Sequence, residues 1–486
     1  VPCPLGTMLR RTKIVATLGP ATDSEAVLEE IIRSGADVVR VNFSHGEAAD
    51  HRRRVDGVRR AAAAVGKHVA VLGDLQGPKI RIERFAAGRA VLTEGEPFAL
   101  DSGLDSLEGT DRAVGITYAD LPRDVQPGDE LILGDGQVEL RVVSVAGTRV
   151  ECVVTTGGEV SDHKGINRRG GGLSARALTD KDREDVRLAA ALDVDYLAVS
   201  FVRQAADVEE ARALLRAAGS EARIVAKIER SEAIPRLEEI IRASDAVMVA
   251  RGDLGVEVGY AQLTGLQKRI LHLARSLDRV TITATQMMES MIHSPVPTRA
   301  EVSDVANAVL DGTDAVMLSA ETAAGKYPVE TVETMAQICV EAEKSDAVVL
   351  DRDFLNRTFT RIDQSIAMAT LFTAFHLRVK AIASLTQSGS TALWMSRHNA
   401  GCPIFALTPE VGAQRKMALY RNVRTLYLEQ SGDRDAVLHA ACDLLVARGQ
   451  VQNGDLIVVT IGEPMGKSGG TNTMKIVRVG EHRSTP

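Results

Sequence analysis

The chain has 486 residues and a formal net charge of −7, and aromatic residues make up only 3% of it. This acidic balance argues against a nucleic-acid-binding or membrane-surface protein, so any anion site must be a local concentration of basic side chains. The five cysteines form no Cys-x-x-Cys pair, and no apolar run reaches the roughly 18 residues of a membrane span. We therefore expect a cytoplasmic protein without a disulfide framework, and its length predicts about three domains.

Eight short apolar runs, mostly separated by helical stretches, dominate residues 8–82 and 173–344. They cover residues 13–19, 35–45, 69–75, 193–201, 224–229, 243–253, 280–286 and 312–322. Such runs are typical of strands buried on both faces of a parallel sheet. Because polar residues gather where the runs end, we predict a (β/α)₈ TIM barrel with its active site on that face. An open doubly wound sheet is the alternative, although it would not need eight such strands. Residues 1–7, before Met8, are expected to be an added leader.

Between the third strand and its helix, residues 83–172 change to short strands and tight turns. Asp135-Gly136 between two apolar runs indicates a hairpin, and the glycine-rich segment 168–172 indicates a hinge. We predict an inserted, all-β, β-barrel-like domain that closes over the site as a lid. A passive β-domain is the alternative.

A further alternation of strands and helices begins after about residue 344. Strands are expected near residues 381–386, 404–408, 423–428, 456–461 and 475–479. This pattern predicts a C-terminal, doubly wound α/β domain over residues 345–486.

Two strand ends of the barrel carry the most informative polar residues. Lys227 and Glu229 close one run and Asp253 closes the next. Alternate residues of a strand share a face, so Lys227 and Glu229 should point the same way. One lysine with two carboxylates suits Mg²⁺ or Mn²⁺ beside an anionic, oxygen-rich substrate. A buried Lys–Glu ion pair with a capping aspartate is the structural alternative.

Nine short motifs spread over the chain share one further property. They occupy residues 13–20, 40–46, 74–81, 227–229, 251–255, 285–287, 297–301, 317–322 and 469–476. Each of them, in this order, resembles a segment of the pyruvate kinase family, and the resemblance covers essentially the whole length. One short motif would be weak evidence, but this many in family order indicate a member of that family.

The resemblance implies transfer of the phosphoryl group of phosphoenolpyruvate to ADP, which gives ATP and pyruvate in the last step of glycolysis. It implies a homotetramer in the cytoplasm, without nucleic-acid or membrane partners. Glu229 and Asp253 would bind Mg²⁺ or Mn²⁺. The other expected roles are catalysis for Lys227, Thr285 and Arg40, substrate binding for Arg40, Lys227, Gly252, Asp253 and Thr285, and nucleotide binding for Arg81, Lys181 and His45.

Two residues depart from the pattern of the many relatives that need K⁺ as well as Mg²⁺. Lys79 stands where those relatives have glutamate, and Leu75 where they have threonine, whereas Asn42, Ser44 and Asp74 of the monovalent-ion region are present. The ammonium of Lys79 can place a positive charge near the K⁺ position and leave Asp74 neutralised. We therefore expect activity without K⁺. In the alternative, Lys79 points to solvent and K⁺ still binds.

A hydroxyl-rich loop follows a strand and precedes a helix in the C-terminal domain. Hydroxyl groups and free N–H groups at a helix start can bind phosphate, and in relatives this loop holds an effector phosphate. We expect activation by a phosphorylated sugar or a nucleoside monophosphate, and simple N-capping is the alternative. The expected contacts are Thr386, Ser388, Gly389, Ser390 and Thr391.

Two other functions stay open at the level of sequence. One is a magnesium-dependent barrel enzyme of enolate chemistry, such as an aldolase or mutase, that uses no nucleotide. The other is an inactive sugar-phosphate sensor built on the kinase fold. The inserted domain and Lys181 argue against the first, and the intact Lys227, Glu229, Asp253 and Thr285 argue against the second.

Overall fold

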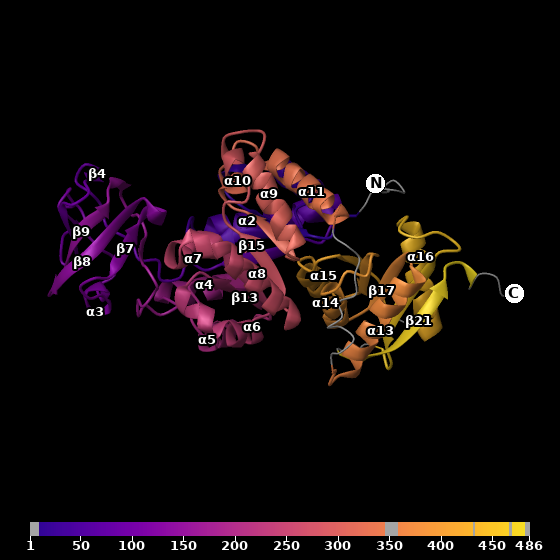
Figure 1. Cartoon of the computed structure of the whole chain (residues 1–486). Helices are drawn as coiled ribbons and strands as arrows, with labels where there is room; N and C mark the ends of the chain where they lie inside the picture. Colours follow the sequence, from indigo (N-terminus) through magenta and orange to yellow (C-terminus); the bar gives the residue numbers. More distant parts are fainter. Residues whose placement is uncertain (1–8, 346–357, 431–432, 466–468, 482–486) are drawn as a thin grey trace.

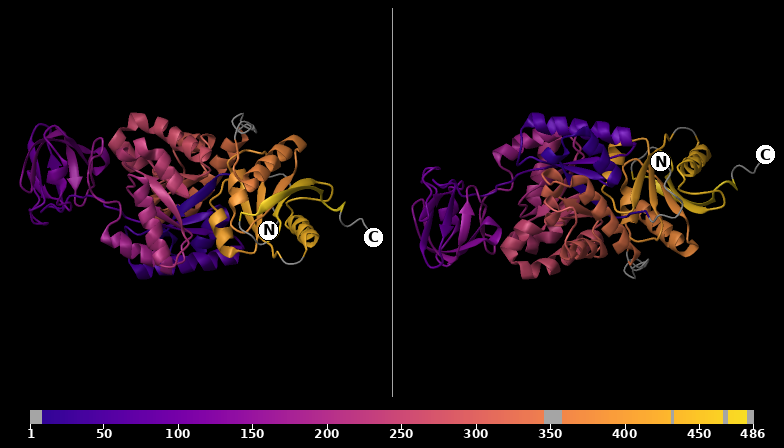
Figure 2. Two further views of the ribbon diagram at one scale, coloured as in Figure 1. Left: turned by 90° about the horizontal axis from the view of Figure 1, so that it is seen from below. Right: turned by 90° about the horizontal axis from the view of Figure 1, so that it is seen from above.

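The computed structural model describes residues 9–345, 358–430, 433–465 and 469–481. They form a central barrel, with a β-domain at one end and an α/β domain at the other (Figure 1). The views from below and above show the same order of parts (Figure 2). The leader expected at residues 1–7 lies outside the described residues.

Eight parallel strands close the barrel in the order β1-β16-β15-β14-β13-β12-β3-β2. All eight coincide, within a few residues, with the runs predicted to be strands, so the TIM-barrel prediction is confirmed and the open sheet is excluded. The strands are β1 (Lys13–Thr17), β2 (Val38–Asn42), β3 (Ala70–Asp74), β12 (Tyr196–Val199), β13 (Arg223–Ile228), β14 (Ala246–Ala250), β15 (Val280–Ala284) and β16 (Ala315–Leu318).

Alternate side chains of a barrel strand belong to different cores. In β14, Val247 and Val249 pack in a cluster with the surrounding helices, whereas Ala246 and Met248 belong to a second cluster with residues of neighbouring strands. This alternation explains the continuous apolar runs, because both faces of each strand are buried.

Helices cover the outside of the barrel. Two of them begin with a reciprocal cap: Thr179 accepts from the Asp182 N–H at the start of α4, and Thr298 accepts from the Glu301 N–H at the start of α9. The helices are α1 (Glu25–Ser34), α2 (Ala48–Val65), α4 (Asp180–Ala191), α5 (Ala205–Ala217), α6 (Leu237–Ala243), α7 (Arg251–Val258), α8 (Tyr260–Ser276), α9 (Arg299–Leu310), α10 (Ala320–Ala323) and α11 (Pro328–Lys344), with 3-10 turns η1 (Pro20–Thr22), η3 (Ser231–Arg236) and η4 (Glu289–Ile292).

The inserted domain follows β3 and is built almost entirely of strands around a core of its own. A six-stranded sheet has the order β11-β7-β8-β9-β5-β6, and β10 pairs with β4. The hairpin predicted at Asp135-Gly136 is present and joins β7 to β8. Its connecting loop, residues 134–137, contains the 3-10 turn η2 (Gly134–Gly136). The other elements are β4 (Arg89–Leu92), β5 (Pro97–Asp101), β6 (Ala113–Gly115), α3 (Leu121–Asp124), β7 (Glu130–Leu133), β8 (Val138–Ala146), β9 (Arg149–Thr156), β10 (Gly158–Ser161) and β11 (Ile166–Arg168).

The C-terminal domain contains one sheet of five strands in the order β19-β18-β17-β20-β21. Four strands are parallel, and the edge strand β21 runs antiparallel to β20. The last strand begins four residues earlier than the sequence suggested. The elements are α13 (Ile362–Leu377), β17 (Ala381–Leu385), α14 (Ser390–Ser396), β18 (Ile404–Thr408), α15 (Val411–Met417), β19 (Val423–Tyr427), α16 (Arg434–Ala447), β20 (Leu456–Gly462) and β21 (Thr471–Arg478).

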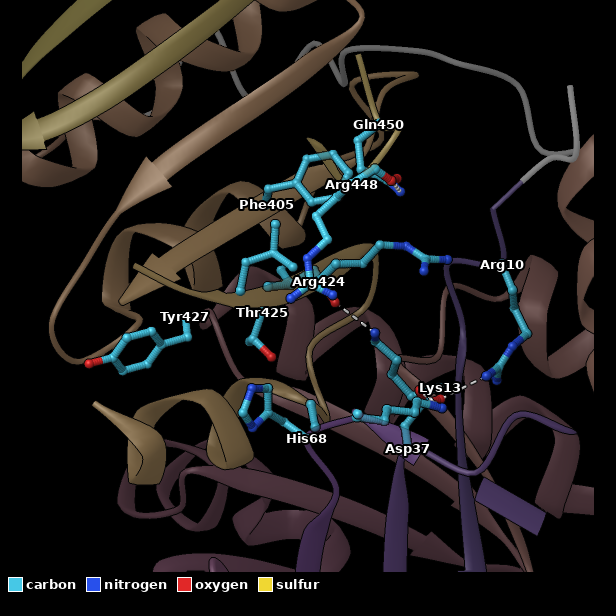
Figure 3. A pocket seen from close by; sticks show the side chains of 15 residues that line it. Arg10, Lys13, Asp37, His68, Phe405, Arg424, Thr425, Tyr427, Arg448 and Gln450 are labelled. Atoms are coloured by element: carbon cyan, nitrogen blue, oxygen red, sulfur yellow. Dashed lines mark hydrogen bonds and ion pairs between the residues drawn. The ribbon is translucent and has the colours of Figure 1, made fainter. Parts of the chain in front are cut away.

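Polar contacts join this domain to the barrel end opposite the lid. Lys13 Nζ donates to the Val423 carbonyl at 2.7 Å, and the buried Arg397 pairs with Asp314. A cavity of about 410 Å³ lies at the joint, and Lys13 and Asp37 of the barrel face Arg424 and Arg448 across it (Figure 3). Within the described part of the chain, no helix is both long and apolar enough to span a bilayer.

Candidate active site

Lys227, at the end of β13, is the centre of an ionic cluster at the mouth of the barrel. Its Nζ lies 2.9 Å from Glu229 Oε1 and 3.3 Å from Asp74 Oδ1, and it donates to Ser200 Oγ at 2.7 Å. The strand alternation therefore brings Lys227 and Glu229 together as predicted. Because the contributing strands are parallel, their carboxyl ends deliver all these groups to one edge.

The carboxylates fix the protonation state of this lysine. Burial alone would lower the pKa of Lys227, but Asp74 and Glu229 outweigh it and raise that pKa above its usual value. Burial would likewise raise the pKa of Asp74, but Lys227 and Arg40 hold it below the usual range. The cluster thus presents a permanent ammonium at the site.

Glu229 and Asp253 fit a divalent cation. Glu229 is 2% exposed, and burial raises its pKa; the charge of Asp253 adds to this effect while Lys227 opposes it. Two carboxylates that repel each other gain from a cation between them. Among the described residues no group of three or more His, Cys, Asp or Glu side chains could hold a metal. This donor set suits Mg²⁺, which takes few protein carboxylates and completes its shell with substrate and water oxygens.

Arg40, in the middle of β2, turns its guanidinium toward the same cluster. Its Nε donates to Asp74 Oδ2 at 2.6 Å and its Nη1 to Thr17 Oγ1 at 3.3 Å. Asp74 thus orients Arg40 and Lys227 together, and two cationic side chains converge where an anionic substrate could bind.

Thr285 and Gly252 lie against each other where β15 and β14 end. A Cβ at Gly252 would lie 2.9 Å from Thr285 Cγ2, so only glycine allows this approach. Thr285 has a φ of 77°, which is unusual for a β-branched residue, and its carbonyl accepts a hydrogen bond from Arg251 at 2.7 Å. Such strain is typical of functional positions. Gly252 and Asp253 lie in the first turn of α7, where N–H groups suit an anion.

The three nucleotide candidates lie around the first lid crossing. Lys181 Nζ donates to the Phe43 carbonyl at 2.7 Å, two residues before His45. Arg81 donates to the His163 carbonyl of the inserted domain at 2.8 Å. Burial lowers the pKa of His45, and the charges of Arg81, Arg40 and Lys79 lower it further. These residues therefore form a basic rim beside the site, which suits a polyphosphate.

Lys79 is placed differently from the expectation. The sequence suggested that it would keep Asp74 neutralised, but Arg40 and Lys227 already do so. Lys79 Nζ lies instead 3.5 Å from Asp253 Oδ1. In the monovalent-ion region, Asn42 Oδ1 accepts from the Ser44 N–H at 3.1 Å. The single charge of Lys79 is therefore directed at a candidate metal carboxylate.

The hydroxyl-rich loop lies in the other domain, between β17 and α14. Thr386 Oγ1 accepts from the Gly389 N–H at 2.9 Å, and Thr391 shares a buried hydrogen bond with Thr471. Ser388 and Ser390 lie 3.4 Å apart through their hydroxyls. Part of the loop thus caps itself, and the two serines carry the hydroxyls with the weakest internal bond.

Several contributing residues were not singled out from the sequence. Ser200 bonds to Lys227, and Arg251 makes a two-pronged ion pair with Asp304 at 2.7 Å. Arg230, which follows Glu229 directly, is 3% exposed and interacts with Glu232 and Glu257. A signal was available for Arg230, because an arginine beside a candidate metal ligand at a strand end is seldom buried without a purpose.

Comparisons with known proteins agree with this geometry. A family model described as "Pyruvate kinase, barrel domain" matches residues 9–332, and one described as "Pyruvate kinase, alpha/beta domain" matches residues 364–477. The chain is 53% identical over 475 residues to Pyruvate kinase II of Salmonella typhimurium, which covers 97% of this chain and 99% of that protein. It is 52% identical over 458 residues to a pyruvate kinase of Haemophilus influenzae, with 93% and 96% covered. A pyruvate kinase of Corynebacterium efficiens is 42% identical over 479 residues, with 99% and 100% covered. With both domain models matched and this identity along nearly its whole length, the chain is an enzyme of the pyruvate kinase family.

Proposed function

We propose that this enzyme transfers the phosphoryl group of phosphoenolpyruvate to ADP in the cytoplasm, and so catalyses the last step of glycolysis. The main support is the ionic cluster at the barrel mouth. It contains Lys227, Glu229, Asp74 and Arg40, with Asp253 beside it. Phosphoryl transfer needs mainly positioning and charge stabilisation, and this cluster supplies both.

The roles follow from the charges. Arg40 offers a planar fork to the phosphoryl oxygens. Lys227, held protonated by its two carboxylates, stabilises negative charge on the moving phosphoryl group and on the enolate left behind. The N–H groups of Gly252 and Asp253 bind the substrate carboxylate, and Glu229 and Asp253 bind Mg²⁺ or Mn²⁺. When bound, this cation supplies charge neutralisation at the phosphate and enol oxygens.

The remaining steps concern the proton and the acceptor. The enolate must gain a proton at carbon to become pyruvate, and we assign the delivery of that proton to Thr285, acting through a water molecule. Arg81, Lys181 and His45 contact ADP at the basic rim.

A coupled assay for pyruvate tests this function. Purified enzyme given phosphoenolpyruvate and Mg²⁺ should produce pyruvate only when ADP is present, and none when the cation is chelated. Pyruvate formation without ADP would instead favour a nucleotide-independent enolate enzyme. No turnover with folded protein would favour a sensor.

We propose further that the enzyme needs no K⁺. The pairing of Lys79 with Asp253 supports this proposal, because a fixed ammonium already lies beside the metal carboxylate. Leu75, which offers no oxygen to a monovalent cation, is consistent with it.

We also propose that a phosphorylated sugar or a nucleoside monophosphate activates a homotetramer by binding at residues 386–391. The support is the pair of hydroxyls at Ser388 and Ser390, together with a contact to the barrel: Arg223 of β13 donates to the Ser388 carbonyl at 3.1 Å. Because Lys227 lies on the same strand, the loop has a direct connection to the catalytic domain.

A further inference from the structure

The lid returns to the barrel through three successive glycines. Gly170, Gly171 and Gly172 have φ values of 79°, 78° and 94°, a region that strongly favours glycine. A Cβ at Gly171 would overlap Glu232 Oε2 and Ser231 Oγ. The returning segment, residues 170–173, therefore passes so close to the barrel that a side chain at Gly171 would force Glu232 and Ser231 to move.

Three hydrogen bonds from backbone groups of residues 170, 172 and 173 fix this segment to the barrel. The Gly170 N–H donates to the Glu257 carbonyl at 3.1 Å, and the Gly172 N–H donates to Glu232 Oε1 at 2.6 Å. The Leu173 carbonyl accepts from Arg230 Nη2 at 3.2 Å. Arg230 and Glu232 follow β13 closely, as Glu229 does, and Glu257 lies near the end of α7, the helix whose first turn contains Asp253.

Arg230 connects these partners. Its side chain is 4% exposed, Nη2 lies 2.8 Å from Glu232 Oε1, and Nε lies 3.9 Å from Glu257 Oε1. Glu257 also accepts from the Ser231 N–H at 2.8 Å. Burial would raise the pKa of Glu232, but Arg230 and the backbone hydrogen bonds, the Gly172 N–H among them, together lower it; burial raises the pKa of Glu257 to about 7. Glu232 is therefore the main counter-ion of Arg230.

We propose that Arg230 is a positioning residue that fixes the returning segment of the lid, residues 170–173, relative to the two metal carboxylates. It is adjacent to Glu229 in the chain, and it reaches the lid both directly, at Leu173, and through Glu232, at Gly172. Among the described residues, the outgoing crossing is held by the ion pair of Lys79 with Asp253 and by the Gly77 N–H, which donates to Asp182 Oδ1 at 3.0 Å. Arg230 differs from these attachments because it follows Glu229 directly.

The consequence for catalysis rests on the proposed function. Arg81 lies on the outgoing crossing and bonds to the lid at His163, so the lid's orientation sets where this nucleotide candidate lies. A displacement of about 1 Å in such a group can cost up to about a hundredfold in rate. Among the described residues, Arg230 makes its polar contacts with Leu173, Glu232 and Glu257, none of which is a candidate substrate or metal residue. Its loss should therefore affect ADP more than phosphoenolpyruvate or the cation.

Arg230→Gln, Arg230→Lys and the control Arg236→Gln test the proposal. Arg236, at the end of the 3-10 turn that begins after Arg230, donates to Gln204 and makes no hydrogen bond or ion pair with the lid crossing among the described residues. Three quantities are measured: amide hydrogen exchange of peptides covering Gly170 and Gly172, the Kd for Mn²⁺, and the separate KM values for ADP and phosphoenolpyruvate. Hydrogen exchange and Mn²⁺ binding do not depend on turnover, so they test the contacts between Arg230 and the lid even if the proposed reaction fails.

In Arg230→Gln we expect exchange at Gly170 and Gly172 to become at least about tenfold faster, since hydrogen bonds to a charged group are lost. The KM for ADP should rise about tenfold while the Kd for Mn²⁺ and the KM for phosphoenolpyruvate stay within about twofold. The exchange rates and the KM for ADP of Arg230→Lys should lie between those of the parent enzyme and Arg230→Gln. Arg236→Gln should match the parent enzyme in both.

Gly171→Ala tests the same contact from the lid side, with Arg230 unchanged. Its added methyl group pushes the crossing away from Glu232, so it should reproduce the faster exchange and the higher KM for ADP. Unchanged exchange in a folded Arg230→Gln protein would overturn the proposal, whatever Gly171→Ala shows, because alanine is strained at the φ of 78° of Gly171. A loss of Mn²⁺ affinity in Arg230→Gln as large as the change in KM for ADP would also overturn it, because Arg230 would then act through Glu229.

Discussion

At the scale of single residues, Lys227 is defined by the carboxylates that surround it. A buried ammonium with two carboxylates within 3.3 Å stays charged at every physiological pH, and its third contact, Ser200, keeps it directed into the site. The charge it offers is needed most when negative charge develops on the enolate.

Lys227→Met should therefore lower kcat by at least about a thousandfold, because a transition-state interaction in a dry site is lost. Circular dichroism confirms folding, and the kinetics give kcat and KM separately. The same substitution at an exposed lysine of α8, Lys268→Met, serves as the control. Near-normal kcat in a folded Lys227→Met protein would rule out the assigned role.

Lys79 provides the second prediction at this scale. If its ammonium replaces a monovalent cation, the parent enzyme should be equally active in buffers with and without K⁺, at one ionic strength held by tetramethylammonium chloride. Lys79→Glu should then become dependent on K⁺, and Lys79→Met should lose activity that K⁺ does not restore. Strong stimulation of the parent enzyme by K⁺ would mean that Lys79 does not serve this purpose.

At the scale of elements, the loop between β17 and α14 is where the effector proposal can fail. Two carboxylates introduced at Ser388 and Ser390 would repel a phosphate, but they leave the buried Thr386 and Thr391 contacts intact. We expect the double change Ser388→Glu and Ser390→Glu to abolish activation by the effector, with basal kcat unchanged. Ser388→Ala and Ser390→Ala control for the hydroxyls alone. Full activation in the glutamate variant would place the effector elsewhere.

Some elements and contacts could be predicted from the sequence, and others could not. The eight barrel strands were predictable because burial on both faces leaves long apolar runs, and the meeting of Lys227 with Glu229 followed from strand alternation. The partner of Lys79 was not predictable, because the sequence does not specify which acidic group a long, flexible side chain approaches. The Arg230 cluster was missed for a similar reason: its contacts join residues 170–173 to residues 230–257, and no local pattern specifies such a pairing.

At the scale of the whole molecule, the joint between the barrel and the C-terminal domain contains a buried lysine. Lys13 lines the cavity at the joint and holds the Val423 carbonyl, and Figure 3 shows it beside Asp37. Burial lowers the pKa of Lys13 to about 7 from 10.5, although Asp37 opposes the shift. Between those pH values the unfolded chain binds more protons than the folded one, so this lysine makes stability rise with pH.

Lys13→Met should reduce the gain in unfolding free energy between pH 7 and pH 9 by on the order of 2 kcal/mol, since the titrating group is gone. Denaturant unfolding at the two pH values measures this gain. Lys326→Met, at an exposed lysine, should behave like the parent protein. An unchanged gain in Lys13→Met would show that Lys13 does not titrate in this range.

We propose that Glu229 and Asp253, delivered by neighbouring strands, together hold the divalent cation at the barrel mouth. Titration of the purified enzyme with Mn²⁺, followed by electron paramagnetic resonance of the free ion, tests it most directly and requires no turnover. We predict one tight site in the parent enzyme, and an affinity reduced at least about tenfold in both Glu229→Gln and Asp253→Asn, because each removes a ligand. Parent-like Mn²⁺ binding in both folded variants would contradict the assignment of Glu229 and Asp253 as ligands of the cation.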